Sequence, residues 1–390
     1  MTAPSSARAD RPRGWTVLIG ALVALTVATG IVAVPWFLLQ DRAAPAPPAG
    51  PRWFGGYVDV TAGVGTAGTT DSAGDAEVLA FVVAAAPQTC APTWGGAYSL
   101  AEAGHALDLD HLVERARQGG GPVAISFGGP RGTELAGACV SVGALADAYG
   151  AVLDRYAVTT MDLDLSGPAL DDATAGERRA HAVAQLQAGH RARGIDLAVW
   201  ITLPAGRDGL DTDGLRSIRQ MQQAGVQLTG VNAMTGDDAA SPGGPSPGDA
   251  AVSALTAVHD QLGRLYDELN VALPADGAWA IMGATPTIGR TGGHDEVFGL
   301  DDAATVNAFA QRQRLARLSM WSVNRDHACA AEDSADPASG GCSGIPQQDG
   351  AFASVLGRGW GAGEAGRGAP PRLASAPTPS PSTSAAEPDP

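Results

Sequence analysis

The sequence predicts an α/β fold, namely a closed (β/α)8 TIM barrel that is preceded by one N-terminal transmembrane helix. Two observations support this expectation: eight short β-rich runs in the middle of the chain, and a long apolar run near its start. Loops and helical patterns follow most of the β-rich runs, which is typical of a parallel sheet with helices outside it. A count of eight favours a closed barrel, with an open doubly wound sheet as the competing topology.

The expected strands are the eight β-rich runs, taken in chain order. They cover residues 54–60, 78–84, 123–127, 159–165, 197–203, 228–234, 279–283 and 318–323. Apolar residues three or four positions apart predict helices between them, for example over 109–117, 145–156 and 178–191. Because chemistry in such barrels lies at the carboxyl ends of the strands, those ends are where candidate site residues are expected.

Composition divides the chain into five segments. These are a cytoplasmic basic tail (1–14), a transmembrane signal-anchor (15–39), an Ala/Pro linker (40–52), the barrel (53–360) and a Pro/Ser/Ala tail (361–390). The last segment lacks apolar periodicity, so it cannot bury enough apolar surface to offset its ordering entropy and is expected to be disordered.

The expected anchor runs from Trp15 to Leu39 without a charged residue, and about 20 apolar residues suffice to cross a bilayer. Arg8, Arg11 and Arg13 precede it and favour a cytoplasmic N-terminus. We therefore expect a single-pass protein of the cell membrane with the barrel outside. Cleavage of the same segment as a signal peptide, which would release a secreted barrel, remains the alternative.

Composition also excludes several functions. The formal charge of −16 repels nucleic acid, and a neutral substrate fits it better. The chain contains no lysine, which excludes a Schiff base and a phosphate-binding P-loop, and no cofactor is expected.

The four cysteines are expected to form two disulfides outside the cell, where disulfides persist. Proximity in sequence pairs Cys90 with Cys139 and Cys329 with Cys342. A metal site is not expected, because the chain has neither a CxxC pair nor histidines at ligand spacing.

The run from Met161 to Gly167 alternates between apolar and polar residues at the end of the fourth expected strand. Period-two geometry places Asp162, Asp164 and Ser166 on one face, directed into the barrel. Two carboxylates there are costly unless they share protons or hydrogen bonds, which indicates a functional role. A calcium loop is the competing interpretation, but its twelfth position is Ala173, where a glutamate is needed.

The sequence resembles glycoside hydrolase family 18, the bacterial chitinase branch in particular. The signature of that family on its fourth strand, DxDxE, corresponds in this sequence to Asp162, Asp164 and Ser166. Further matching segments are spread over the barrel: Tyr57-Val58-Asp59-Val60, Ser126-Phe127-Gly128-Gly129, Thr202-Leu203-Pro204, Val231-Asn232-Ala233-Met234, Met320-Trp321-Ser322, Asn324-Arg325-Asp326 and Cys342-Ser343-Gly344-Ile345. Each match is weak alone, but their common order makes the resemblance specific.

This resemblance implies substrate-assisted hydrolysis of β-1,4-linked N-acetylglucosamine, an exception to the scheme of two catalytic carboxylates. In the family, the glutamate of the motif protonates the leaving oxygen, and the aspartate before it orients the acetamido group of the substrate. The tryptophan at the position of Trp321 forms the floor of the sugar site. The implied substrate-binding residues are Trp321, Asp237, Tyr57, Asn232 and Met234.

Two departures from the family pattern concern the catalytic machinery. Ser166 occupies the position of the acid, and serine cannot act as a general acid near neutral pH. The family's Met-Asp-Tyr motif after the sixth strand corresponds to Gly236-Asp237-Asp238, which lacks the tyrosine. We therefore expect a pseudoenzyme that binds chitin-like or peptidoglycan-like glycans and whose hydrolysis is lost or severely impaired.

Two alternatives remain open on the sequence alone. The first is an active glycosidase that uses another carboxylate, with Glu134 and Asp237 as candidates. The second is a structural envelope protein that uses the barrel only as a scaffold, because a fold does not fix a function.

Overall fold

The computed structural model describes residues 51–62, 76–236, 244–290, 297–330 and 341–360. Among these residues, no helix is both long enough and apolar enough to cross a membrane. The expected anchor at 15–39 lies outside the described residues, as do the tail segments 1–14 and 361–390 and most of the linker 40–52. The candidate residues Asp237 and Asp238 are also outside them.

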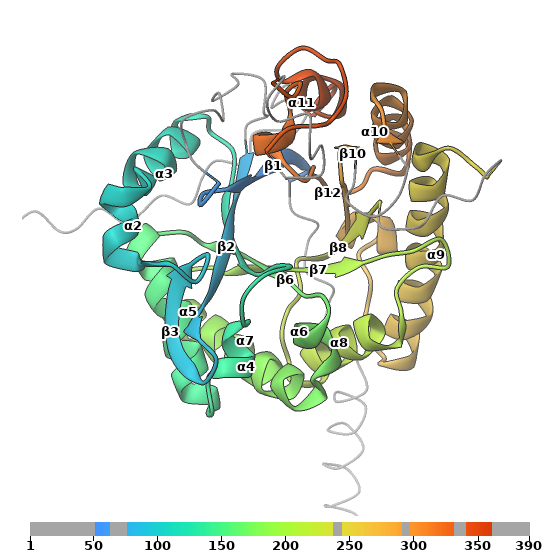
Figure 1. Cartoon of the computed structure of the whole chain (residues 1–390). Helices are drawn as coiled ribbons and strands as arrows, with labels where there is room; N and C mark the ends of the chain where they lie inside the picture. Colours follow the sequence, from blue (N-terminus) through green and yellow to red (C-terminus); the bar gives the residue numbers. More distant parts are fainter. Residues whose placement is uncertain (1–50, 63–75, 237–243, 291–296, 331–340, 361–390) are drawn as a thin grey trace, which may run out of the picture.

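Eight parallel strands close into a barrel, which Figure 1 shows close to end-on. They are β1 (Trp53–Asp59), β2 (Ala76–Ala86), β5 (Val123–Gly128), β6 (Thr160–Asp164), β7 (Ala198–Pro204), β8 (Gly230–Thr235), β9 (Met282–Pro286) and β12 (Arg317–Leu318). Parallel pairing of β1 with both β12 and β2 joins the two ends of the sheet. The predicted closed barrel is confirmed, and the open doubly wound alternative is excluded.

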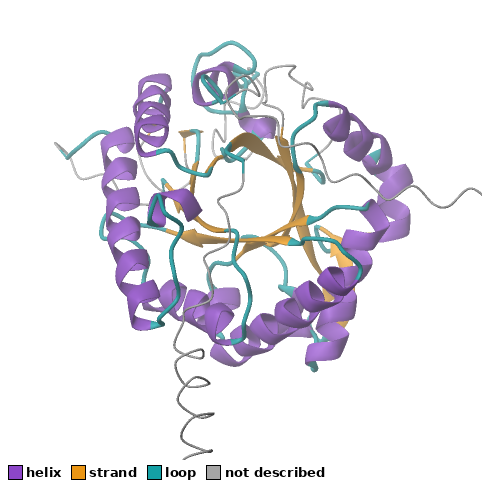
Figure 2. Cartoon of the chain, turned by 180° about the vertical axis from the view of Figure 1, so that it is seen from behind, coloured by secondary structure: helices purple, strands orange, loops and turns teal. Residues whose placement is uncertain are grey.

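Helices surround the barrel as an outer ring, as Figure 2 shows from behind. The described helices are α2 (Leu100–Ala106), α3 (Leu109–Gln118), α4 (Leu135–Ala138), α5 (Val142–Tyr156), α6 (Pro168–Asp171), α7 (Ala173–Ala192), α8 (Thr212–Gln223), α9 (Pro247–Glu268), α10 (Leu300–Gln313) and α11 (Ala351–Leu356), with 3-10 turns η1 (Ala278–Ile281) and η2 (Val323–Arg325).

Side-chain caps explain why two helices begin earlier than expected. The Ser141 hydroxyl accepts the amide of Ala144, so α5 begins at Val142 and not at residue 145. The Asp172 carboxylate accepts two amides at the start of α7, which begins at Ala173 and not at residue 178. Such caps satisfy amides that have no partner within the helix.

The seventh and eighth expected strands are wrong in their boundaries. Trp279 belongs to η1 and stacks on His259 of α9, with ring centroids 4.1 Å apart, so β9 begins only at Met282. The last strand is only two residues long. The Asn324 side chain accepts from the amide of Asp59 at 2.8 Å and donates to its carbonyl at 3.0 Å. These two hydrogen bonds hold η2 at the end of β1, where the sequence predicted a longer eighth strand.

A short antiparallel extension of the barrel was not predicted from the sequence. β2 continues to Ala86 and pairs with β3 (Thr89–Trp94), which in turn pairs with β4 (Tyr98–Ser99). A second small ladder joins β10 (Gly289–Arg290) to β11 (Val297–Phe298). The described structure thus adds hairpins to a regular barrel without changing its closure.

Both predicted disulfides are confirmed. Cys90 of β3 is bonded to Cys139 at the end of α4, with Cα atoms 4.5 Å apart. The second disulfide joins Cys329 to Cys342, with Cα atoms 5.1 Å apart. The first therefore fastens the extra hairpin to the short helix that follows β5.

The strands of the barrel separate two buried regions, one between strands and helices and one inside the barrel. Met161, Leu163 and Leu165 are fully buried in the apolar layer between strands and helices, as the alternation in sequence predicts. Inside the barrel, Trp53, Tyr57 and Trp200 form a smaller cluster with short aliphatic side chains. Polar groups lie above this cluster and lead to the carboxyl ends of the strands.

Candidate functional site

A buried polar layer inside the barrel is centred on Asp162, whose exposure is 0%. Its Oδ1 accepts from the Thr202 hydroxyl and from Arg317 Nη1, both at 2.7 Å. Its Oδ2 accepts from the Tyr57 hydroxyl at 2.9 Å and from the Ser126 hydroxyl at 2.8 Å. Each oxygen thus has two donors, so the carboxylate is satisfied without sharing a proton. Asp162 was expected at the site, but the structure places it beneath the surface that a ligand can reach.

Arg317 is the counter-charge of Asp162, and our reading of the sequence missed it. Its guanidinium carbon lies 4.8 Å from the ring centroid of Trp53, 5.3 Å from that of Tyr57 and 5.4 Å from that of Trp200. Burial would lower the pKa of Arg317, but the neighbouring Tyr57 and Asp162 outweigh it and the pKa is raised. The sequence did contain a signal for this role, because Arg317 is a single arginine between apolar residues of the last strand. A cation buried in this way needs a buried partner of opposite charge.

Asn232 and Tyr57 belong to the same layer. Asn232 donates to the hydroxyls of Thr202 and Thr285 at 3.0 and 2.8 Å and is fully buried. Burial raises the pKa of the Tyr57 phenol well above its usual value, so Tyr57 remains a donor to Asp162. Tyr57 therefore contacts Asp162 directly, whereas Asn232 is linked to it through the hydroxyl of Thr202.

The carboxyl ends of the strands carry the residues closest to the barrel mouth. Trp321 is partly exposed and stacks on Phe81 of β2, with centroids 5.2 Å apart and planes 23° apart. It also contacts the edge of Tyr57 at 5.9 Å. Asp164 ends β6 and Met234 lies near the end of β8. Three of the predicted site residues, Trp321, Asp164 and Met234, are thus at this end of the barrel.

Phe81 extends the aromatic wall and was not among the predicted residues. A side chain at Gly129 would place its Cβ 2.6 Å from the Phe81 ring, so this glycine leaves room for the ring. At Gly128, whose φ is +100°, a Cβ would lie 2.2 Å from the carbonyl oxygen of Asp164. The Gly-Gly pair at the end of β5 therefore allows the aromatic wall and the end of β6 to approach closely.

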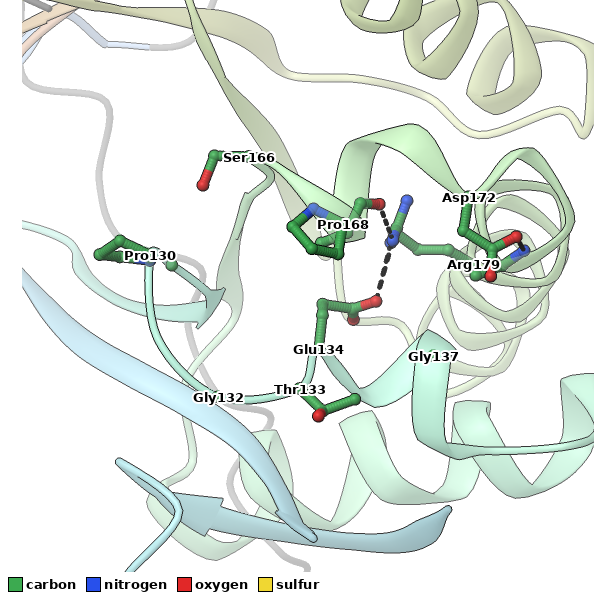
Figure 3. A pocket seen from close by; sticks show the side chains of 12 residues that line it. Pro130, Gly132, Thr133, Glu134, Gly137, Ser166, Pro168, Asp172 and Arg179 are labelled. Carbon is green, nitrogen blue, oxygen red and sulfur yellow. Dashed lines mark hydrogen bonds and ion pairs between the residues drawn. The ribbon is translucent and has the colours of Figure 1, made fainter. Parts of the chain in front are cut away.

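Ser166 lies two residues beyond β6, at a cavity of about 320 Å³ between the barrel and α7 (Figure 3). The walls come from the loops after β5 and β6, from α4 and from α7. The lining residues are Gly129, Pro130, Gly132, Thr133, Glu134, Gly137, Ser166, Pro168, Ala169, Asp172, Ala175 and Arg179. Ser166 is partly exposed there, and backbone pairing with β7 continues as far as the amide of Leu165, which donates to the carbonyl of Thr202 at 3.0 Å.

Glu134 shares this cavity with Ser166, but its carboxylate is fully engaged. Arg179 Nη2 donates to its Oε2 at 2.9 Å, and both side chains are at most 3% exposed. The amide of Ala136 also donates to Oε2, and the Tyr149 hydroxyl donates to Oε1. Burial, and then the charge of Glu134, raise the pKa of Tyr149 well above its usual value, so Tyr149 keeps its proton. Glu134 is a structural anchor for the loop and α4.

No group of three or more histidine, cysteine, aspartate or glutamate side chains in the described part of the chain could hold a metal ion. The polar residues around Ser166 are instead hydroxyl and carboxylate groups and the guanidinium of Arg179, which is paired with Glu134. Such groups bind a neutral polar ligand by hydrogen bonding.

No family model matches the sequence. The chain is 35% identical over 255 residues to the "Probable bifunctional chitinase/lysozyme" of Escherichia coli K12 and 33% identical over 255 residues to "Endochitinase 11" of Metarhizium anisopliae. Each match covers 64% of this chain, but only 28% and 47% of those relatives.

Solved structures agree with these relatives. The catalytic domain of the hyperthermophilic chitinase from Pyrococcus furiosus aligns with 80% of this chain and 95% of its own length, at 28% identity and a TM-score of 0.65. A catalytic-site mutant of a chitinase domain from the same organism, solved with chito-oligosaccharides, aligns with a TM-score of 0.64. The chain is thus similar to chitinases in sequence and in fold, in agreement with its resemblance to glycoside hydrolase family 18.

Proposed function

We propose that this protein binds chitin-type glycans, which contain N-acetylglucosamine, at the carboxyl end of its barrel, and that its hydrolytic activity is lost or severely impaired. The observation that carries the proposal is the combination of an aromatic wall at Trp321 with a serine at position 166, where the family motif has its proton donor. A sugar ring packs against an aromatic face, whereas bond cleavage also needs an acid within hydrogen-bond reach.

The carboxylates around Ser166 support the loss of hydrolysis. Two of the residues that line the cavity are acidic, Glu134 and Asp172. Glu134 is held by Arg179, Tyr149 and an amide, as described above. Asp172 Oδ1 accepts the amides of Thr174 and Ala175 as the cap of α7. Since both have structural partners, neither is a ready substitute for the missing acid, and Asp237 remains the candidate for an active-enzyme alternative.

Replacing Trp321 with alanine is expected to weaken binding of an N-acetylglucosamine oligomer at least about fivefold, since an aromatic contact contributes about 1 kcal/mol beyond its buried area. Titration calorimetry with chitotetraose would measure the change. Trp279→Ala is the matched control, because Trp279 precedes β9 and so lies at the opposite end of the barrel. Equal losses in both variants would contradict a sugar contact at Trp321.

We also propose that residues 15–39 anchor the barrel outside the cell membrane, on the apolar run and the preceding arginines. Protease added to intact cells is expected to digest the barrel, while a membrane pellet keeps the N-terminal fragment. Recovery of a soluble form that begins near Ala46 would instead show cleavage of a signal peptide.

A further inference from the structure

We propose that four arginines at the amino end of the barrel dock on the anionic headgroups of a phospholipid membrane, so that the barrel mouth faces away from that membrane. These residues, which we call the arginine cluster, are Arg52, Arg312, Arg314 and Arg358. The choice of a membrane as the partner rests on the proposed anchor at residues 15–39. The cluster itself rests on contacts between described residues.

Gln311 of α10 brings the cluster together from separate parts of the chain. Its Oε1 accepts from Arg52 Nη2 at 3.0 Å, and its Nε2 donates to the carbonyl of Arg358 at 3.5 Å. Arg312 follows it in the last turn of α10, and Arg314 is the residue at which that helix ends. Burial, and then the charge of Arg314, lower the pKa of Arg52, so these two guanidinium groups lie near each other. Arg52 is partly exposed and the other three arginines are exposed.

No carboxylate of the described residues neutralises the cluster, since none of its four arginines takes part in an ion pair there. The other contacts of Arg52 are neutral: its Nε donates to the Leu315 carbonyl at 2.9 Å, and its guanidinium carbon lies 4.6 Å from the ring centroid of Trp360. The helix dipole favours arginines at the end of α10. It does not account for Arg52 and Arg358, which belong to no helix.

The cluster lies at the end of the barrel opposite the mouth. Arg52 immediately precedes β1, and the amide of Trp53 donates to the carbonyl of Ala316, which immediately precedes β12. Both strands therefore begin beside the cluster, whereas Trp321 follows the carboxyl end of β12. A membrane that contacts the cluster leaves the barrel mouth open.

The mouth carries the opposite charge. Each outer helix of such a barrel returns the chain from the carboxyl end of one strand to the amino end of the next, so its first turn lies on the side of the mouth. Asp213, Asp249 and Asp301 are in the first turns of α8, α9 and α10. Charges more than about 8 Å away are largely screened at physiological salt. An anionic surface is thus attracted at the cluster even though the formal charge of the chain is −16.

The connectivity of the chain brings the cluster to the membrane. Arg52 is the last residue of the linker 40–52, which follows the proposed anchor. At about 3.5 Å per extended residue, this linker spans at most about 45 Å. A tether of this length gives the cluster an effective concentration of about the millimolar range, and each arginine near an anionic surface adds about fivefold in affinity. Four such contacts favour a docked barrel.

The test measures which end of the barrel approaches the lipid. The full chain is reconstituted into vesicles of phosphatidylcholine, alone or mixed with phosphatidylglycerol, that carry an energy-transfer acceptor on a lipid headgroup. One dye is attached at Asp267→Cys near the end of α9 or at Asp249→Cys in its first turn, about 27 Å away along the helix. Both are exposed, and the native cysteines are all in disulfides, so only the introduced thiol reacts.

Adding phosphatidylglycerol is expected to increase energy transfer from position 267 much more than from position 249. High salt should remove the increase. Arg312→Gln with Arg314→Gln is expected to lower the docking equilibrium constant about 30-fold and to abolish the increase. Arg131→Gln with Arg207→Gln is the matched control, because it removes the same charge from two exposed arginines that follow β5 and β7 on the side of the mouth. This control should behave as wild type.

An equal response of the two double variants, or no increase with phosphatidylglycerol, would overturn the inference. If the vesicles caused no increase but the cluster retained dextran sulfate, its partner would be a soluble polyanion and not a membrane. Flotation with pure phosphatidylcholine vesicles tests the anchor separately. If the chain did not float with them, flotation with mixed vesicles would report the cluster alone, and the Arg312→Gln with Arg314→Gln protein should then bind about 30-fold more weakly than the control.

Discussion

Arg317→Met is expected to lower the free energy of unfolding by about 3 to 5 kcal/mol, the usual cost of leaving one partner of a buried ion pair uncompensated. The variant keeps an apolar side chain among the aromatic rings of Trp53, Tyr57 and Trp200, so packing is largely preserved. What it removes is the cation at 2.7 Å from Asp162, at a place where both side chains are 0% exposed. Chemical denaturation monitored by tryptophan fluorescence would measure the loss.

The matched control is Arg219→Met on the surface. Arg219 pairs with Glu268 at 3.0 Å, but the two side chains are 39% and 58% exposed. Exposed pairs contribute about 0 to 1 kcal/mol, so a small loss is expected. Arg317→Lys is expected to fall between the two, because lysine keeps the charge but lacks the planar fork that also reaches the Ser319 hydroxyl. A loss for Arg317→Met as small as for Arg219→Met would show that the pair does not support the barrel core.

The second large effect concerns hydrolysis. The double change Ser166→Glu with Asp238→Tyr is expected to raise the rate of glycoside cleavage about 10²- to 10⁴-fold above wild type, the usual contribution of a general acid. Ser166→Glu alone should give less, because Asp238 stands where the family has its tyrosine. A longer side chain has room at position 166, since Ser166 lines the cavity of about 320 Å³. Release of a fluorescent aglycone from a chitobiose conjugate measures all variants.

Ser166→Gln, combined with Asp238→Tyr, is the control for this experiment. Glutamine has the size of glutamate but no acidic proton, so its rate is expected to stay at the wild-type level. If the glutamine variant gained as much as the glutamate variant, proton donation would not be the missing function. Wild-type turnover of about 1 to 10³ per second, the ordinary range for enzymes, would indicate another acid and direct attention to Asp237.

The sequence was sufficient to predict the barrel because each strand shows its own local pattern. The alternation around Met161 and Leu163 fixed which side chains face the helices, and these residues are buried as expected. Boundaries were less predictable. Trp279 looks like a strand residue locally, but its stacking on His259, a contact between distant parts of the chain, places it in a 3-10 turn.

The site was predicted only in part, for a similar reason. Period-two alternation correctly directs Asp162 into the barrel, but the depth of that side chain depends on donors from four other strands. Arg317 can serve as the counter-charge of Asp162 only because the closed barrel brings β12 within reach of β6, a contact that no local pattern predicts. Likewise, no local pattern brings Glu134 and Arg179 together at the cavity beside Ser166, because they are 45 residues apart in sequence.

The most direct test of glycan binding without cleavage is to mix the wild-type protein with chitohexaose, measure the binding heat, and analyse the sugar recovered after prolonged incubation. Saturable binding with the hexamer recovered intact is the expected result, since Trp321 supplies a sugar contact and Ser166 supplies no acid. Shorter oligomers formed in many-fold excess over the protein, or the absence of any binding heat, would contradict it.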